Sequence, residues 1–177
     1  MIKPVLLTIG LLLFSLQFLA AQKPAETLSE YEETYKWRIR QDYLYGVYIP
    51  KDLGDAFIQL NKLIDADSKK DFMSLPEEQA ADILFFSFGR WITHNWGFYG
   101  GSRLSEFLRG VGIYHPEDMA RFVIITYHRN LHRKSLDVKA LVDQFQEKTR
   151  LEQEAKKKGG EIIYEETRKR DPKDDGS

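Results

Sequence analysis

The residues best suited to chemistry lie in the segment 91–133, which contains all four histidines of the chain. Residues 100–103, Gly-Gly-Ser-Arg, come directly before an expected helix. Free backbone N–H groups, a hydroxyl and a guanidinium would therefore meet at the positive end of that helix, and such an arrangement accepts a phosphate or a carboxylate. A tight turn with Ser102 as N-cap explains the same residues without a ligand.

An anion bound at this turn would need further hydrogen-bond donors and a side chain that encloses the pocket, and the sequence supplies candidates for both. Trp96 precedes the glycine-rich stretch, while His128 and Arg129 lie on the helix expected after Pro116. The predicted ligand-binding residues are Trp96, Ser102, Arg103, His128 and Arg129. The aromatic residues of this region have two further interpretations, a surface that stacks a sugar or a base and ordinary packing. They are Trp91, Trp96, Phe98 and Tyr99.

A catalytic alternative starts from His115 and Asp118, which lie three residues apart on either side of Pro116. A carboxylate can hold an imidazole in the tautomer needed for general-base work. The alternative function is therefore a hydrolase that uses His115 with Asp118, or His128, while Arg129 steadies a developing negative charge. A helix start, with Asp118 bonding back to free N–H groups, explains the same residues without catalysis. Since the chain shows no catalytic signature, we favour a protein that is not an enzyme.

His128 and His132 stand four residues apart on one expected helix, which is a spacing found in metal sites. Metalloprotease spacing would also require a glutamate between them and a third ligand, neither of which is present. Arg121 lies on the same helix flank and would repel a divalent cation. The sequence therefore predicts no metal and no cofactor.

The elements that must position these residues are helices. Apolar residues at helical spacing predict a mainly α fold, a compact single-domain bundle of about five to six helices with a glycine-rich central loop. Ser29 and Glu32 resemble a capping box that opens the first helix. The segment 35–49 also fits a period of two, so a strand or hairpin is the alternative there. The expected helices span about residues 30–43, 52–66, 76–92, 102–109, 116–133 and 136–158.

The two ends of the chain differ from this middle part. Residues 1–21 have a lysine, a long apolar run and two alanines before Gln22, as in a secretory signal peptide, with an uncleaved membrane anchor as the alternative. Segment 22–44 is expected as an N-terminal helical segment, 45–133 as the core domain and 134–158 as a C-terminal helix. Segment 159–177 is rich in both charges and is expected to be a disordered tail.

Composition limits what the protein can do. The 177 residues contain 26 Lys and Arg against 27 Asp and Glu, which excludes a strongly basic nucleic-acid binder. The absence of cysteine excludes thiol chemistry and lipid attachment at the N-terminus, and is consistent with export to the periplasm or the outside. Basic residues predominate in 89–134 and acidic ones in 42–88. The expected partner is an anionic small molecule or an envelope protein, with no membrane span after signal cleavage.

Three stretches of the core domain resemble a known protein family. They are Trp91-Ile-Thr-His-Asn-Trp-Gly-Phe-Tyr-Gly-Gly-Ser-Arg-Leu104, Gly112-Ile-Tyr-His-Pro-Glu-Asp-Met119 and Tyr127-His-Arg-Asn-Leu131. Together they resemble a family of small bacterial domains of unknown function, often found behind a signal peptide. The resemblance implies a compact helical domain and carries no activity or ligand. His94 and His132 do not match the family's pattern. We therefore expect a non-catalytic exported binding domain with a net-basic pocket, with the hydrolase or an envelope protein-interaction module as alternatives.

Overall fold

A computed structural model describes residues 27–160 of the chain, so the expected signal peptide at 1–21 lies outside the described residues. The expected tail also lies outside them, apart from residues 159 and 160, which end the last helix rather than begin a tail. Within the described residues, no helix combines the length and apolar character needed to span a membrane.

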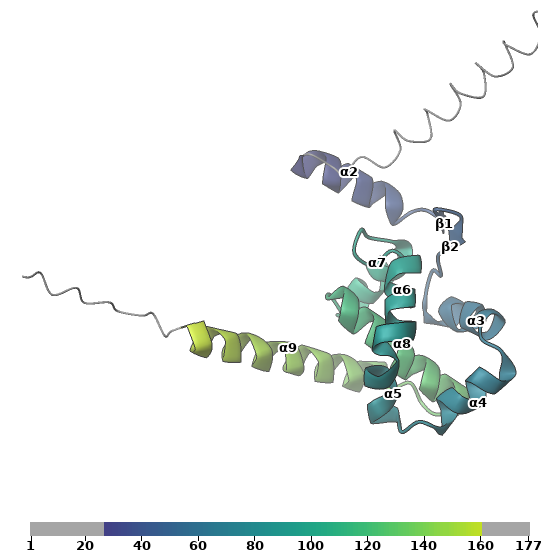
Figure 1. Cartoon of the computed structure of the whole chain (residues 1–177). Helices are drawn as coiled ribbons and strands as arrows, with labels where there is room; N and C mark the ends of the chain where they lie inside the picture. Colours follow the sequence, from purple (N-terminus) through teal and green to yellow (C-terminus); the bar gives the residue numbers. More distant parts are fainter. Residues whose placement is uncertain (1–26, 161–177) are drawn as a thin grey trace, which may run out of the picture.

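The fold is compact and mainly α, as the apolar spacing predicted (Figure 1). A single small antiparallel hairpin accompanies the helices in the described part of the chain, with Tyr43 opposite Tyr48 and Leu44 opposite Val47. In chain order the elements are α2 (Leu28–Arg38), β1 (Tyr43–Leu44), β2 (Val47–Tyr48), α3 (Leu53–Leu63), α4 (Ala66–Ser74), α5 (Glu77–Leu84), the π-helical turn η2 (Phe85–Gly89), α6 (Arg90–Asn95), α7 (Arg103–Val111), α8 (Pro116–Leu131) and α9 (Val138–Gly160).

Helix α8 is the centre of the core. It contacts α3, α4, α5, η2, α6, α7 and α9, and Figure 1 shows it enclosed by these elements while α9 runs outward from the body. Its inner side chains are fully buried, because they carry the apolar repeat that the sequence showed. These side chains are Met119, Ala120, Phe122, Val123, Ile124 and Tyr127.

The N-terminal helix differs from the prediction in both its start and its end. The capping box uses Thr27 and Glu30 rather than Ser29 and Glu32, with the Thr27 side chain accepting from the Glu30 N–H. The helix ends at Arg38, five residues before the expected end at 43. The chain then forms the hairpin that was the alternative, because Tyr45 and Gly46 both take positive φ values of 52° and 79°, as a two-residue hairpin turn requires.

The helix expected over 76–92 is broken into three parts, α5, η2 and α6. A π-helical turn inserts one residue per turn relative to an α-helix, so the residues after it rotate onto a different face. Trp91, expected on the inner face, is therefore 37% exposed, whereas Trp96, expected to wall a pocket, is only 1% exposed. Helix α4 was also missed, although Asp65 caps it through the N–H groups of Asp67 and Ser68.

Candidate functional site

The glycine-rich loop at 97–101 is covered by side chains of α2. Arg38 is buried against this loop and donates from Nε to the carbonyl of Gly101 at 2.9 Å and from Nη1 to the Tyr45 hydroxyl at 2.9 Å. Tyr35 covers Gly101 and donates its hydroxyl to Glu106 at 2.5 Å. Burial and this hydrogen bond raise the pKa of Tyr35 to about 12, so the phenol stays protonated. Gly97 and Gly100 lie against the Arg38 guanidinium and Gly101 against the Tyr35 ring, so the three glycines of the loop provide room for α2 to dock.

Ser102 and Arg103, predicted to hold an anion, are both engaged by the protein. Ser102 is fully buried at the N-cap of α7, where its Oγ accepts from the Ser105 N–H at 3.2 Å. Arg103 donates from Nε to the Ile49 carbonyl at 2.6 Å and pairs with Asp42 through Nη1. The interpretation as turn and N-cap is therefore the one that the geometry supports.

Arg129 also has a complete set of protein partners. Its Nε and Nη2 donate to the Glu77 carboxylate at 2.9 and 2.7 Å, and its Nη1 donates to the Leu136 carbonyl at 2.6 Å. The hydrogen bonds from Arg129 hold the pKa of Glu77 below its ordinary value. The side chain therefore ties α8 to the start of α5 and to the segment that leads into α9.

His128 and His132 hold the end of α4 against α8. The Nε2 atoms of the two rings donate to the carbonyls of Leu75 and Met73, each at 3.0 Å. His128 is only 2% exposed, and its Nδ1 has no hydrogen-bond partner among the described residues. Burial lowers the pKa of His128, which keeps the ring neutral. No group of three or more His, Cys, Asp or Glu able to hold a metal ion occurs in residues 27–160.

We expect the free energy of unfolding to decrease as the pH falls below about 6.5, the ordinary pKa of histidine. In that range the unfolded chain protonates His128, while the folded protein resists because the ring is buried. The unfolded state then binds more protons, so the stabilisation is complete above this pH and is lost as the pH falls. Urea unfolding at several pH values, together with an NMR titration of the ring, measures this effect.

The matched control for this titration is His94→Asn, because His94 is exposed. That variant should keep the same pH dependence of unfolding. A His128 ring that titrates at or above pH 6.5 in the folded protein would contradict the prediction.

The five predicted ligand-binding residues do not share one pocket. Trp96 and Ser102 lie in the core, and the polar atoms of Arg103, His128 and Arg129 are directed mainly at backbone and carboxylate groups. A ligand in contact with them would have to displace these partners, so we correct the expectation of a shared surface. Ser102 instead caps α7, Arg103 ties α7 to the segments on either side of the hairpin, and His128 and Arg129 hold α8 against neighbouring segments.

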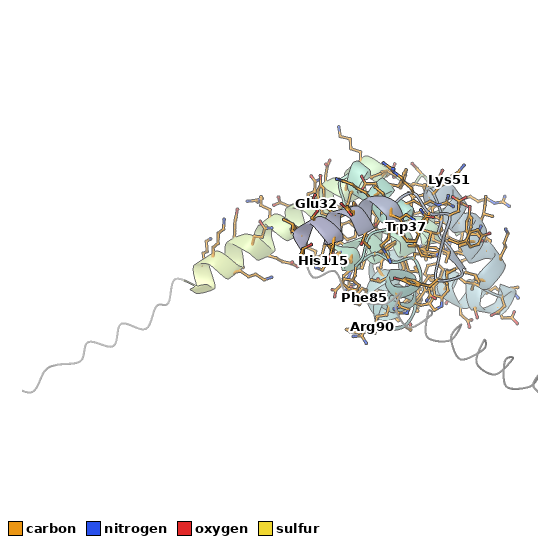
Figure 2. The ribbon with its side chains drawn as sticks, turned by 90° about the horizontal axis from the view of Figure 1, so that it is seen from above. Glu32, Trp37, Lys51, Phe85, Arg90 and His115 are labelled. Carbon is orange, nitrogen blue, oxygen red and sulfur yellow. The ribbon has the colours of Figure 1, made fainter. Side chains whose placement is uncertain are left out.

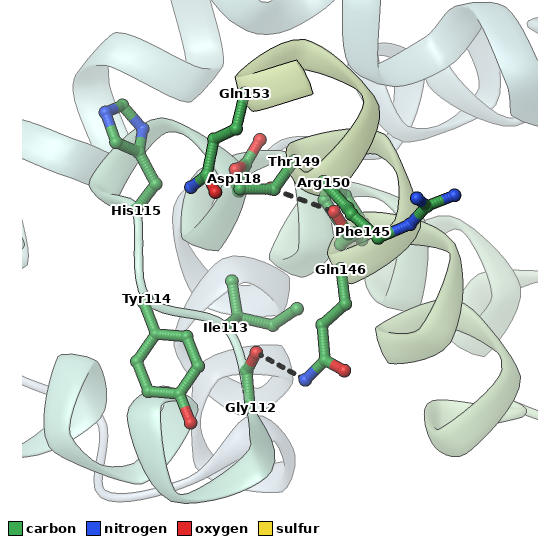
Figure 3. A pocket seen from close by; sticks show the side chains of 10 residues that line it. All are labelled: Gly112, Ile113, Tyr114, His115, Asp118, Phe145, Gln146, Thr149, Arg150 and Gln153. Atoms are coloured by element: carbon green, nitrogen blue, oxygen red, sulfur yellow. Dashed lines mark hydrogen bonds between the residues drawn. The ribbon is translucent and has the colours of Figure 1, made fainter. Parts of the chain in front are cut away.

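His115 and Asp118, the pair of the catalytic alternative, line the same cavity, but no hydrogen bond joins them in the described part of the chain. Both line a cavity of about 420 Å³ between the turn that joins α7 to α8 and the first half of α9. Figure 3 shows the His115 ring, the Gln153 side chain and the Asp118 carboxyl at the same end of this cavity. Asp118 makes no hydrogen bond among the described residues, so the interpretation as a side-chain cap is wrong. Burial raises the pKa of its carboxyl.

His128 and Arg129 cannot complete that pair. They lie ten or more positions after Asp118 on the same helix, which is about 15 Å at 1.5 Å per residue. Thr149 is the cavity's hydroxyl side chain besides Tyr114, and it donates to the Phe145 carbonyl at 3.0 Å. The cavity therefore holds a histidine and a carboxyl without a free aliphatic hydroxyl nucleophile among its lining residues.

A second cavity, of about 500 Å³, is lined by basic and aromatic side chains that the sequence prediction did not choose. Arg90 and Arg121 face it together with a single acid, Glu117, and we call this the basic cavity. Figure 2 places Phe85 and Arg90 at one edge of the helical body, away from Lys51. The complete lining is Phe85, Phe86, Arg90, Thr93, His94, Tyr99, Glu117 and Arg121.

The side chains of the basic cavity are only partly engaged. Arg90 lies over the Phe86 ring at 5.6 Å and His94 is exposed, and neither makes a hydrogen bond within residues 27–160. Arg121 pairs with Asp82 and lies over the Phe85 ring at 4.1 Å. A neighbouring cavity of about 450 Å³ shares His94 and Tyr99, so the hollow continues toward the hairpin. The signal that could have found it was the excess of basic residues in 89–134.

These features describe a small helical domain, built around one central helix, with two cavities beside the first turn of that helix. Residues 49–131 match the family model described as domain of unknown function (DUF6794). The matched segment spans α3 to α8, and the match agrees with the resemblance of the three sequence stretches to an uncharacterised domain family. No curated protein and no solved structure matches the chain.

Proposed function

We propose that this protein is an exported, non-catalytic binding domain whose ligand carries an anionic group. The observation that carries the proposal is the basic cavity, where Arg90 and Arg121 face Glu117 and the total charge of the lining is positive. Arginine is well suited to phosphates and carboxylates because its planar guanidinium donates two parallel hydrogen bonds. The site of the expected anion thus moves from Ser102 and Arg103 to Arg90, whose side chain makes no hydrogen bond within residues 27–160, and Arg121, which pairs with Asp82.

The aromatic side chains narrow the kind of ligand. Tyr99 is 65% exposed and Phe86 is 72% exposed, and both line the basic cavity. Exposed aromatic faces next to guanidinium groups favour a ligand that combines a flat apolar part with its negative charge. We therefore retain Tyr99 as a residue that stacks on a flat ring of the ligand.

Export is supported by the N-terminal pattern alone, since residues 1–21 have the order of a signal peptide. The absence of cysteine agrees with an oxidising compartment. We propose a periplasmic or secreted location on this basis.

The binding experiment uses the protein recovered after export. Sequencing its N-terminus also shows whether the signal peptide is cleaved after Ala21. We expect phenyl phosphate to bind more tightly than inorganic phosphate, as measured by calorimetry. Arg90→Gln should weaken phenyl phosphate binding by about tenfold, because a hydrogen bond to a charged group contributes roughly 1.5 kcal/mol or more. Arg90 is exposed, so this change should leave the fold intact.

Lys134→Gln is the matched control, because it removes an exposed positive charge beyond the opposite end of α8. This variant should bind like the unmodified protein. Equal weakening by both variants would indicate a general charge effect, and the proposed site would then be wrong. Failure of both phosphates to bind would also overturn it.

The hydrolase is the second candidate, because His115 and Asp118 line one cavity. Its other expected parts, His128 and Arg129, bind the protein instead. We therefore favour the binding function over the hydrolase function. The interaction module rests on exposed aromatic side chains of α2 and the hairpin, such as Trp37 and Tyr43.

A further inference from the structure

We propose that the cavity between the α7–α8 turn and α9 binds a primary ammonium group carried on an apolar stem. This cavity is separate from the basic cavity and would hold a group of opposite charge. The two hollows lie on different sides of the first turn of α8, since Glu117 lines one and Asp118 lines the other. Successive helix residues point about 100° apart, which explains how neighbours serve two sites.

The shape of the cavity suits a short apolar stem. Its volume is about 420 Å³, and its inner surface includes the buried side chains of Ile113 and Phe145. Tyr114, which is 64% exposed, stands at the rim. Small-molecule sites combine such an apolar lining with a few polar groups that fix orientation. An aryl or alkyl stem would remove the remaining apolar surface from water.

The polar group at the end of the cavity is Asp118. Its carboxyl is half-buried and has no hydrogen-bond partner in the described part of the chain. Burial without a partner disfavours the charged carboxylate, and this raises its pKa. A ligand cation at hydrogen-bond distance would offset that cost, because opposite charges attract more strongly away from bulk water.

The basic side chains of α9 beside the cavity each have a carboxylate partner on α9, although Lys148 also acts on Asp118 and partly offsets the effect of burial on its pKa. Arg150 bonds to Glu147 at 2.7 Å and to Glu154 at 2.5 Å. Lys148 lies 3.9 Å from Glu152. Four carboxylates, those of Asp118, Glu147, Glu152 and Glu154, thus stand against the three cations Lys148, Arg150 and Arg121, and the balance favours a positive ligand.

The neighbouring amides supply further acceptors for an ammonium, which has three N–H donors. Gln146 donates its amide to the Gly112 carbonyl at 3.2 Å, so its own carbonyl oxygen stays available (Figure 3). Gln153 lies beside Asp118 and makes no hydrogen bond within residues 27–160. Asp118 and Gln153, which lie at the same end of the cavity, can both accept hydrogen bonds from a primary ammonium, while Gln146 lies at the other end beside Gly112 (Figure 3).

The test compares 2-phenylethylamine with 2-phenylethanol, which has nearly the same shape and no charge. We expect the amine to bind at least tenfold more tightly to the full exported chain near pH 7, as measured by NMR titration. The shifted backbone amides should be those of Ile113, Tyr114 and Phe145. Asp118→Asn should reduce the affinity for the amine to that for the alcohol, and leave the affinity for the alcohol unchanged.

Asp143→Asn is the matched control, because Asp143 is an exposed acid of α9 that does not line this cavity. It should leave the tenfold ratio intact. Equal binding of amine and alcohol to the unmodified protein would overturn the proposal, even if Asp118→Asn failed to fold. Shifts outside the cavity, or no binding of either probe, would overturn it as well.

Discussion

Replacing Gly101 by alanine is expected to lower the free energy of unfolding by about 3 kcal/mol. Gly101 has a φ of +84°, a conformation that side chains with a Cβ atom rarely adopt. A Cβ at this position would lie 2.3 Å from the Tyr35 ring, so helix α2 would also have to move. That movement would break the hydrogen bond from Arg38 to the Gly101 carbonyl. Urea unfolding of the variant measures the combined effect.

Two other glycines separate the causes of this loss. Gly46 also has a positive φ, but nothing lies within 4 Å of the added Cβ, so Gly46→Ala should cost about 1 kcal/mol from backbone strain alone. Gly110 lies in α7 with open space around it, and Gly110→Ala should raise stability by about 0.5–1 kcal/mol. If Gly101→Ala were no worse than Gly46→Ala, the docking of α2 on the loop would be wrong.

Trp96→Ala is expected to lower the free energy of unfolding by about 3–5 kcal/mol, the range for removing a fully buried aromatic side chain. Trp96 is 1% exposed and packs edge-to-face on Trp91 with ring centroids 6.0 Å apart. Thermal or urea unfolding followed by circular dichroism measures the loss. The size of the effect would show that this tryptophan belongs to the core rather than to a ligand pocket.

Trp91→Ala is the natural comparison, since it removes the same side chain from a position that is 37% exposed. We expect it to cost about 1–2 kcal/mol, because less apolar surface returns to water. Similar losses for the two variants would mean that η2 does not rotate α6 as described. The helix would then be continuous, as the apolar spacing alone predicted.

Much of the fold followed from local patterns in the sequence. The amphipathic repeats of α3 and α8, the Ser102 N-cap and Pro116 at the start of α8 are determined within a few residues, so they could be predicted. The interruption at Phe85–Gly89 could not, because the helical spacing of apolar residues continues through it from α5 into α6. The residues after it turn onto a different face, and Trp91, which the apolar spacing placed inside, is 37% exposed.

The candidate sites depended far more on contacts between distant parts of the chain. The sequence singled out 91–133 by its residue types, and His115 and Asp118 of this segment line one cavity. It could not show that the guanidinium of Arg129 would be taken by Glu77, 52 residues away, or that α2 would place Arg38 at the glycine loop. Such partners are determined by the packing of distant segments, so they cannot be predicted from residue spacing along the chain.

The sequence by itself determined that this is a cysteine-free, mainly helical domain with an N-terminal export pattern and a basic segment following an acidic one. Only the tertiary structure decided which of its polar groups are free. Arg103, His128 and Arg129 are occupied by protein partners, while Arg90 and Asp118 face open cavities. The reason is physical: most buried donors find an acceptor when the chain folds, and the packing of distant segments that supplies this acceptor cannot be read from spacing along the chain.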